Sequence, residues 1–308
     1  MRSNFVNQVI IEMQKNPRIF FLTADLGFNA LEPLRDKFGP RFINAGIAEA
    51  NMIGVAAGLA LTGKKVIAYS IAPFITMRCY EQIRLDIAYH NLDVKLIGIG
   101  GGFNYGDQGV THHTIEDVAI MRVLPNMKII CPAYAWETQE ATRAILKDNG
   151  PAYLRIGISP GADYHQSNWR FKIGRGFVIQ KGKDIALFCT GNVLDLTLNT
   201  AALLKQKLKT NIAVISLPTV KPLDKDLILK IARETKHIFT IEENNVIGGL
   251  GSAVADLLIG QKNLQTNFRS FGIPDVYIKD VGTREYLCSK AGLDAQQISR
   301  KIVKQIGK

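Results

Sequence analysis

Apolar and polar positions along the chain follow two periods, and the order in which these periods alternate predicts an α/β fold. Short continuous apolar runs are typical of strands buried in a parallel sheet, whereas apolar residues three or four positions apart are typical of amphipathic helices. In the first half, strand-like runs occupy residues 18–24, 41–45, 65–70, 94–99, 127–131 and 152–156. Helix-like stretches occupy residues 5–15, 31–38, 52–61, 76–89, 116–124 and 135–147. This alternation predicts parallel strands joined by helices.

The periodicity lapses after residue 157 and resumes beyond residue 171. Residues 159–168, SPGADYHQSN, have the composition of a connector. We therefore expect a first domain at 1–158, a linker at 159–171 and a second, smaller α/β domain at 172–308, as a length of 308 residues also suggests. Strand-like runs in this second domain occupy residues 184–190, 211–216, 237–242, 268–271 and 275–278. Its helix-like stretches occupy residues 193–207, 226–235, 252–259 and 295–306.

The net charge of +11 raises the question of a nucleic-acid partner. Residues 1–169 carry 16 Lys and Arg against 15 Asp and Glu, and residues 170–308 carry 22 against 12. The excess lysines are spread over amphipathic segments, without interleaved aromatic residues or an arginine-rich run. A solvated face is therefore favoured over an acidic partner, and no nucleic-acid partner is expected.

Membrane and disulfide signals are both lacking in the sequence. No apolar run is long enough to span a bilayer, and the first residues lack the apolar core and cleavage site of a signal peptide. We therefore expect a cytoplasmic protein without a membrane segment. The four cysteines lie far apart with no Cys-x-x-Cys pair, which predicts buried thiols instead of a zinc site or disulfides.

One carboxylate stands at the start of the most apolar helix-like stretch. From residue 52 to residue 61 every side is apolar, with only Gly54 and Gly58 interrupting, which predicts a fully buried helix. Glu49 lies just ahead of this stretch. A glutamate is rarely buried without a partner, so we expect a cationic or proton-sharing neighbour, or a bound ligand, beside it.

The glycine-rich loop 100–116 is the second candidate site. A long loop after a parallel strand is where open α/β sheets bind ligands, and this one ends in His112 and His113. An imidazole can exchange a proton near neutral pH, so both histidines are candidates for acid–base chemistry or for holding a substrate oxygen. The alternative is that one histidine caps the next helix and the other is exposed. No metal site is expected, because only Asp107 and Glu116 lie nearby, at a spacing that fits no common ligand set.

A second glycine-rich turn, residues 248–251, precedes a helix and invites comparison with phosphate-binding loops. Its spacing fits neither Gly-x-Gly-x-x-Gly in a first βα unit nor Gly-x-x-x-x-Gly-Lys, so we expect a turn with close helix packing. The adjacent carboxylates Glu242 and Glu243 are expected to end a strand in solvent.

Several short segments, taken in order, resemble the pyrimidine-binding domain of thiamine diphosphate enzymes of the transketolase family. They are residues 46–52 (GIAEANM), 69–74 (YSIAPF), 109–113 (GVTHH), 124–127 (LPNM) and the strand that carries Arg155. Residues 170–308, with 241–244 (IEEN) and 248–254 (GGLGSAV), resemble the C-terminal domain of the same family. The resemblance covers nearly the whole chain.

The resemblance implies roles for individual residues. In this family a glutamate at the position of Glu49 hydrogen-bonds the aminopyrimidine of thiamine diphosphate and so promotes loss of the thiazolium proton. A histidine at the position of His112 faces the reacting oxygens of the substrate, which makes Glu49 and His112 the expected catalytic residues. The resemblance places cofactor-binding residues at Asp25, Ile47, Tyr69, Phe74 and Arg78. It places substrate-binding residues at His113, Gln108 and Arg155, the last as a clamp for a sugar phosphate.

The chain also departs from the family pattern. Gln108 stands where family members often have Asp, and residues 100–103 lack the His or Arg that often meets a donor phosphate. A larger difference is that the Gly-Asp-Gly motif and following Asn, which hold Mg²⁺ and the diphosphate, do not occur. The resemblance therefore implies the C-terminal subunit of a split transketolase, which moves a two-carbon ketol unit between sugars or sugar phosphates. An N-terminal, diphosphate-binding partner chain is expected to supply the Mg²⁺ ligands, in a heterotetramer.

Two other functions remain open from the sequence. The beta subunit of a 2-oxoacid dehydrogenase shares the domain order and the glutamate, but that group usually has His-Ser-Gln where this chain has Thr111-His-His. A non-catalytic subunit is the other alternative, and the presence of both Glu49 and His112 argues against it.

Overall fold

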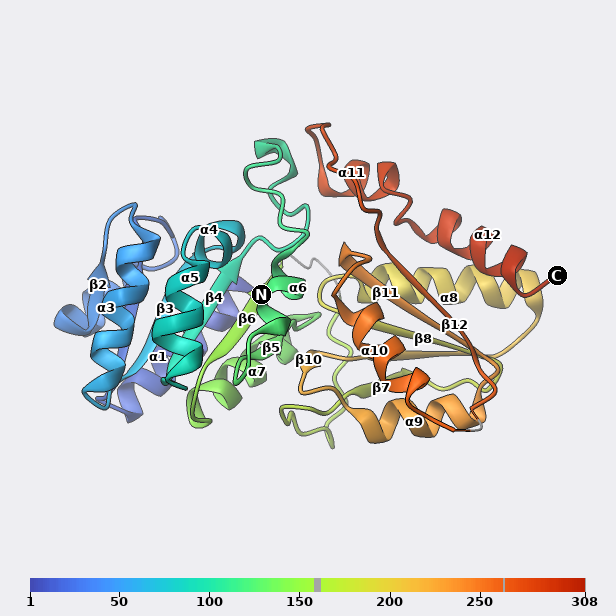
Figure 1. Cartoon of the computed structure of the whole chain (residues 1–308), viewed down its shortest axis with the longest axis horizontal. Coiled ribbons are helices and arrows are strands. Elements are labelled where there is room, and N and C mark those ends of the chain that lie inside the picture. Colours follow the sequence, from blue (N-terminus) through green and yellow to red (C-terminus); the bar gives the residue numbers. More distant parts are fainter. Residues whose placement is uncertain (158–161, 263, 308) are drawn as a thin grey trace.

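The computed structural model describes residues 1–157, 162–262 and 264–307, and it confirms the predicted α/β class (Figure 1). Two sheets lie side by side along the long axis of the molecule, and helices cover both faces of each. Residues 159–161 of the predicted linker lie outside the described residues. The domain boundaries stay a prediction.

The first sheet has seven strands in the order β10-β5-β6-β4-β3-β1-β2. Its strands from the first half of the chain are β1 (Ile19–Thr23), β2 (Phe42–Asn44), β3 (Lys65–Ile71), β4 (Val94–Ile99), β5 (Lys128–Ile130) and β6 (Ala152–Ile156). These six pair in parallel. The edge strand β10 (Thr219–Lys221) comes from the second half of the chain and pairs antiparallel with β5.

Helices bury their apolar stripes against both faces of this sheet. One face carries α3 (Glu49–Leu61), α4 (Ala72–Met77), α5 (Tyr80–Gln82), a π-helical stretch at Ile83–Tyr89 and α6 (Asp117–Val123). The opposite face carries α1 (Arg2–Lys15), α2 (Glu32–Phe38) and α7 (Ala135–Lys147). Because these six strands run in parallel, their carboxyl ends all lie at the same end of the sheet.

The second sheet has five strands in the order β12-β11-β8-β9-β7. They are β7 (Phe177–Gln180), β8 (Ile185–Thr190), β9 (Ile212–Ser216), β11 (His237–Asn245) and β12 (Asn267–Ile273), and all but β7 pair in parallel. One face packs on α8 (Leu194–Leu208), α11 (Arg284–Lys290) and α12 (Ala295–Gln305). The other face packs on α9 (Lys225–Glu234) and α10 (Leu250–Ile259).

Several sequence predictions about elements were wrong. The single helix expected at 76–89 is broken into pieces, with Arg78 and Cys79 between them, and no strand forms at 275–278. The strands β7 and β10 and the helix α11 were not predicted. The helix α3 is not fully buried in this chain, because Val55 is 38% and Leu61 70% exposed. The first sheet therefore leaves part of the apolar surface of α3 uncovered.

Two further properties follow from burial and length. All four cysteines are free and buried, as predicted. Within the described parts of the chain, every helix is too short or too polar to cross a membrane.

Candidate active site

The candidate site lies at the carboxyl edge of the first sheet, where loops from neighbouring strands converge. Glu49 follows β2, Phe74 and Arg78 follow β3, and His112 belongs to the loop 100–116 after β4. These four side chains come from three separate strand–helix connections. The parallel topology brings them together.

Glu49 is the first residue of α3 and its side chain is 3% exposed. The Ser70 hydroxyl at the end of β3 donates to Oε1 of Glu49 at 3.1 Å, and Nη1 of Arg78 donates to Oε2 at 3.3 Å. The start of a helix adds a favourable dipole for a carboxylate. The cationic neighbour expected from the sequence is therefore Arg78.

Arg78 continues the contacts toward the histidine loop. Its guanidinium carbon lies 3.6 Å from the centre of the Phe74 ring, which is cation–π distance. The other neighbour of Phe74 is His112, which meets it edge-on at 5.0 Å between ring centres. We call these four residues, Glu49, Arg78, Phe74 and His112, the Glu49–His112 array. It joins a buried carboxylate to an imidazole through a cation and an aromatic ring.

The two histidines have different surroundings. Burial and the nearby charge of Arg78 lower the pKa of His112, which favours its neutral form, and Nδ1 lies 2.9 Å from the Thr111 hydroxyl. His113 is buried, edge-on to Phe103 at 5.1 Å, with Nε2 lying 3.3 Å from the Gly106 carbonyl. Neither ring caps α6. His112 is thus the histidine that remains partly open to a ligand.

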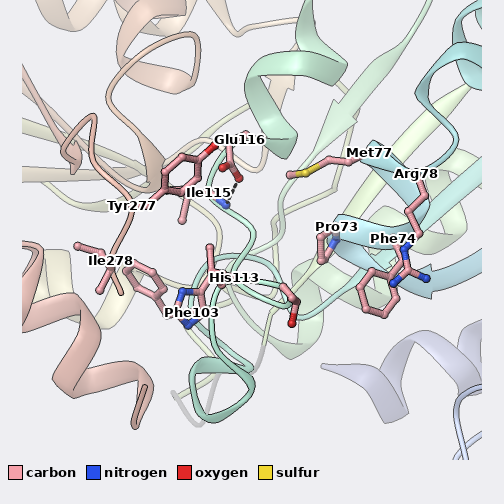
Figure 2. Close-up of a pocket in the computed structure, with 12 residues that line it drawn as sticks. Pro73, Phe74, Met77, Arg78, Phe103, His113, Ile115, Glu116, Tyr277 and Ile278 are labelled. Carbon is pink, nitrogen blue, oxygen red and sulfur yellow. Dashed lines mark hydrogen bonds between the residues drawn. The ribbon is translucent and has the colours of Figure 1, made fainter. Parts of the chain in front are cut away.

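A cleft of about 380 Å³ lies beside the array, between the two halves of the chain (Figure 2). It is lined by Pro73, Phe74, Met77, Arg78, Phe103, Val110, Thr111, His113, Ile115, Glu116, Tyr277 and Ile278. Arg78 is the one Lys or Arg in this lining. Burial raises the pKa of Glu116, which lines the cleft half-buried and was considered from the sequence only as a possible metal ligand. Largely apolar walls suit a ring or carbon skeleton.

Tyr69 does not reach the site, which corrects its expected role beside the cofactor. Successive side chains of a strand point to opposite faces, so Ser70 facing Glu49 sends Tyr69 to the other side of the sheet. There Tyr69 is fully buried and stacks on Phe5 at 6.0 Å between ring centres. The alternation of side chains along this strand could have predicted the placement of Tyr69 from the sequence.

Arg155 does not present its guanidinium to the cleft, which corrects its expected role as a phosphate clamp. It is 5% exposed, and its Nε donates to Asp117 at 2.8 Å. Nη2 donates to the carbonyls of Thr114 and Glu243 at 2.7 and 3.0 Å. A sugar phosphate would have to break this buried set of bonds. Arg155 ties the end of β6 to the second half of the chain.

The remaining predicted site residues lie outside the cleft lining, and their roles stay predictions. Asp25 is exposed and accepts from the Asn44 amide at 2.8 Å at the ends of β1 and β2. Ile47 is 77% exposed just ahead of Glu49. Gln108 is exposed and donates to Asp107 at 3.1 Å.

The adjacent carboxylates Glu242 and Glu243 are both 1% exposed, so their expected position in solvent was wrong. Glu242 accepts the backbone N–H groups of Leu250 and Gly251 at 2.8 and 2.7 Å. Burial raises its pKa to about 7. The glycine-rich turn 248–251 therefore gives N–H groups at its helix start to a carboxylate of the same chain, and they are not open to a phosphate.

Among residues 1–157, 162–262 and 264–307, no three His, Cys, Asp or Glu side chains are grouped so that they could hold a metal ion. The aminopyrimidine half of thiamine diphosphate finds suitable groups in Glu49 and the face of Phe74. A diphosphate with Mg²⁺ finds no such set of oxygen ligands in these ranges.

Comparison with known proteins identifies two family domains. Residues 1–157 match the profile "Transketolase, pyrimidine binding domain", and residues 174–298 match "Transketolase, C-terminal domain". The 6-deoxy-6-sulfo-D-fructose transketolase subunit SqwH of Clostridium sp. (strain MSTE9) is 35% identical over 97% of this chain and 92% of its own length. An apulose-4-phosphate transketolase subunit of Phocaeicola vulgatus is 30% identical, over 100% of this chain and 97% of its own length.

A solved structure described as "Split gene transketolase, inactive beta4 tetramer" agrees in fold and length. It is 35% identical to this chain, covers 98% of it and 96% of its own chain, and has a TM-score of 0.86. The family resemblance drawn from the short motifs is confirmed.

Proposed function

Because this chain belongs to the transketolase family, we propose that it is the C-terminal subunit of a split transketolase that uses thiamine diphosphate to move a two-carbon ketol unit from a ketose to an aldose. The Glu49–His112 array carries the proposal. It connects a buried carboxylate, an aromatic face and an imidazole, and two of its members, Phe74 and Arg78, line the cleft, whereas Glu49 and His112 lie behind that lining. These are the groups that the aminopyrimidine and the reacting substrate would need.

The aminopyrimidine would be held by Glu49 and Phe74. Arg78 now covers the ring face of Phe74 and donates to Glu49, so a bound pyrimidine would take the place of its planar guanidinium. The Arg78 side chain is 48% exposed, which leaves it room to move toward solvent. The buried Glu49 carboxyl would then keep a polar partner, as buried charges require.

When bound, thiamine diphosphate supplies a thiazolium ring that takes up the electron pair of a breaking carbon–carbon bond. Glu49 would share a proton with the pyrimidine ring nitrogen. His112, whose lowered pKa favours the neutral form, would donate to or accept from the substrate oxygens. The apolar residues of the cleft would keep water from the reacting atoms.

A partner chain is part of the proposal, as the holder of the diphosphate and Mg²⁺. The outer face of α3 supports this, because Val55 and Leu61 on this helix are 38% and 70% exposed, and Ile47 just ahead of it is 77% exposed. An added Cβ at Gly54 or Gly58 on that helix would meet nothing within 4 Å. An apolar helix face without cover is typical of an interface. We propose a heterotetramer with two copies of each chain.

The proposal is tested by producing the chain together with a candidate partner that carries Gly-Asp-Gly and a following Asn. The purified complex should transfer a ketol unit from a ketose to an aldose, and only with thiamine diphosphate and Mg²⁺. Glu49→Gln should lower kcat by roughly 100-fold or more, because it removes the proton-sharing carboxyl. Glu234→Gln, the same change at an exposed position of α9, is the matched control.

Three results would count against the proposal. Full activity of Glu49→Gln would favour a non-catalytic subunit. Decarboxylation of a 2-oxoacid, without ketol transfer, would favour the dehydrogenase alternative. A genuine partner lacking the Gly-Asp-Gly motif would remove the split-enzyme arrangement.

A further inference from the structure

The loop 100–116 is held by the second half of the chain, although it connects β4 of the first sheet to α6, which packs on that sheet. Its two stems pair with each other at an isolated bridge between Gly102 and Thr114, with N–H to carbonyl distances of 2.8 and 2.9 Å. His112 and His113 lie on the stretch that this bridge closes. The conformation of the histidines therefore depends on what fixes the two stems.

Glu243, near the end of β11, contacts the first stem. Its Oε1 accepts the Phe103 N–H at 2.7 Å across 140 positions of sequence. The carboxylate can come this close because position 102 is glycine, where an added Cβ would overlap Oε1 of Glu243. The Phe103 ring is fully buried in a core cluster that includes Phe239 and Leu287 of the second half.

Arg284 neutralises the same carboxylate from the other side. Its Nε and Nη2 donate to Oε2 of Glu243 at 2.9 and 2.6 Å, and Nη2 also donates to the Asn192 carbonyl at 3.0 Å. Two charged donors on one carboxylate oxygen restrict the direction of the carboxylate, and its other oxygen is left to the Phe103 N–H. Glu243 is consequently locked in the orientation that meets the loop.

Further bonds from the same region reach both stems. The Gly282 N–H, two positions before Arg284, donates to the Gly106 carbonyl at 3.2 Å. The Asn245 N–H, two positions after Glu243, donates to the Ile115 carbonyl at 2.7 Å. The loop is thus hydrogen-bonded on each side of the histidines by the two segments that contain Glu243 and Arg284.

We propose that Glu243 is a positioning residue, which together with Arg284 lets the second domain set the conformation of the histidine loop. The inference rests on the proposed function, because His112 is the residue presented to substrate. The pair lies on the loop side of the cleft and makes no contact with Glu49 or Phe74 among the described hydrogen bonds. It should therefore affect the substrate step and leave cofactor binding unchanged.

The test measures amide hydrogen exchange on the full chain alone, which needs no activity. Arg284→Lys keeps the positive charge but loses the paired Nε and Nη2 donors of the guanidinium, and Arg284→Gln loses both the charge and the paired donors. We expect exchange at the Phe103 amide and across residues 102–114 to rise by roughly tenfold in Arg284→Gln, with Arg284→Lys between it and the parent chain. Arg175→Gln is the control, because Arg175 pairs with Asp224 elsewhere in the same domain.

The reconstituted complex supplies the second readout. Arg284→Lys should lower kcat/KM for the sugar substrates several-fold while the Kd for thiamine diphosphate stays within about twofold of the parent value. Glu243→Gln should behave in the same direction, since an amide can accept from Phe103 but cannot pair with Arg284 as a carboxylate does.

Each possible result either supports or overturns the positioning role of Glu243. If Arg284→Gln unfolds, exchange will also rise in the interior strand β3, and Arg284→Lys, with its charge kept, becomes the deciding variant. Unchanged loop exchange in a folded Arg284→Lys, or an equal rise in Arg175→Gln, overturns the proposal. A loop that loosens in a complex without transketolase activity refutes the proposed function and leaves the positioning role standing.

Discussion

At the scale of single residues, the pairing of Glu49 with Arg78 explains how an acid can stay buried in the free chain. The guanidinium satisfies one carboxylate oxygen and Ser70 the other. Loss of one partner of a buried pair leaves an uncompensated charge, which is more costly than loss of an exposed pair. The same guanidinium acts electrostatically on His112.

The charge of Arg78 should therefore be visible in the titration of His112. Burial is the larger cause of the lowered pKa of this imidazole, and Arg78 is the next. Arg78→Met removes the second-largest of the causes that lower it, so the pKa of His112 should rise toward its ordinary value. Histidine NMR over a pH series measures it. His237, whose pKa is lowered by burial and by Lys236, should not move, and an unmoved His112 would contradict the prediction.

A buried carboxyl distant from the cleft should make stability depend on pH. Burial raises the pKa of Glu137 to about 7 from 4.5, despite bonds from the Ala133 N–H and the Ser216 hydroxyl. The folded chain thus keeps a proton that the unfolded chain releases. This contribution to stability is complete below about pH 4.5 and is lost as the pH rises through about 7.

Glu137→Gln should remove that part of the pH dependence. Melting temperatures at pH 5 and pH 8 measure it, and each kcal/mol is worth about 2–4 °C in a chain of this size. The parent chain should lose more of its Tm between these two pH values than the variant. Equal losses would show that Glu137 does not titrate as described.

At this scale the sequence predicted which residues lie near the site better than it predicted where their side chains point. Glu49 and His112 were singled out because each has an unusual chemical setting that is visible locally: an acid before an apolar run, and a histidine ending a glycine loop. The structure connects them through Arg78 and Phe74, and their catalytic roles stay predictions. Tyr69 and Arg155 were misplaced because family order says nothing about which face of a strand a side chain takes. The burial of Glu243 was hidden because its partner Arg284 lies far along the chain.

At the scale of elements, Gly102 in the first stem of the loop 100–116 is constrained both in its backbone and in the space around it. Gly102 has a φ of +71°, and an added Cβ would clash with the Glu243 carboxylate. Gly63 has a similar φ of +82° with nothing within 4 Å of an added Cβ. The two glycines separate the cost of backbone strain from the cost of a steric clash.

Gly63→Ala should lower the free energy of unfolding by about 1–2 kcal/mol, which is the cost of a left-handed alanine. Gly102→Ala carries the same strain and also pushes Glu243 off the Phe103 N–H, so it should cost about 1–3 kcal/mol more. Denaturant unfolding of the full chain measures both. Equal losses would mean that the loop yields without effect on Glu243.

Elements with a long, regular pattern were predictable, and short ones that depend on distant partners were not. The strand β6 and the helix α7 were predicted with their observed bounds because their periodicity is unbroken. The strand β10 has three residues, and its pairing partner β5 lies about 90 positions earlier. At 275–278 the apolar residues suggested a strand, yet Val276 and Tyr277 are more than half exposed, and they pair with none of the strands in the described residues.

At the scale of the whole molecule, the outer face of α3 should decide assembly. Val55→Lys puts a charge in the middle of this apolar face, and the proposed partner would have to bury it. Affinity for the partner should fall roughly tenfold or more, while the Tm of the chain alone should change little. Light scattering after gel filtration measures the complex. Ile259→Lys, at a residue of α10 that is 84% exposed, is the control, and equal loss in both would contradict the assignment.

The first sheet can be completed only after the antiparallel strand β10 has been synthesised, because this strand comes from the second half of the chain. About 60 residues separate the end of that domain's own strands from Thr219, so at about 5–20 residues per second the edge of β5 stays unpaired for about 3–12 s. An open edge offers its amides and carbonyls to any other strand. A nascent chain consequently offers β5 as an open edge strand during this interval, and a chain truncated within it would keep that edge unpaired.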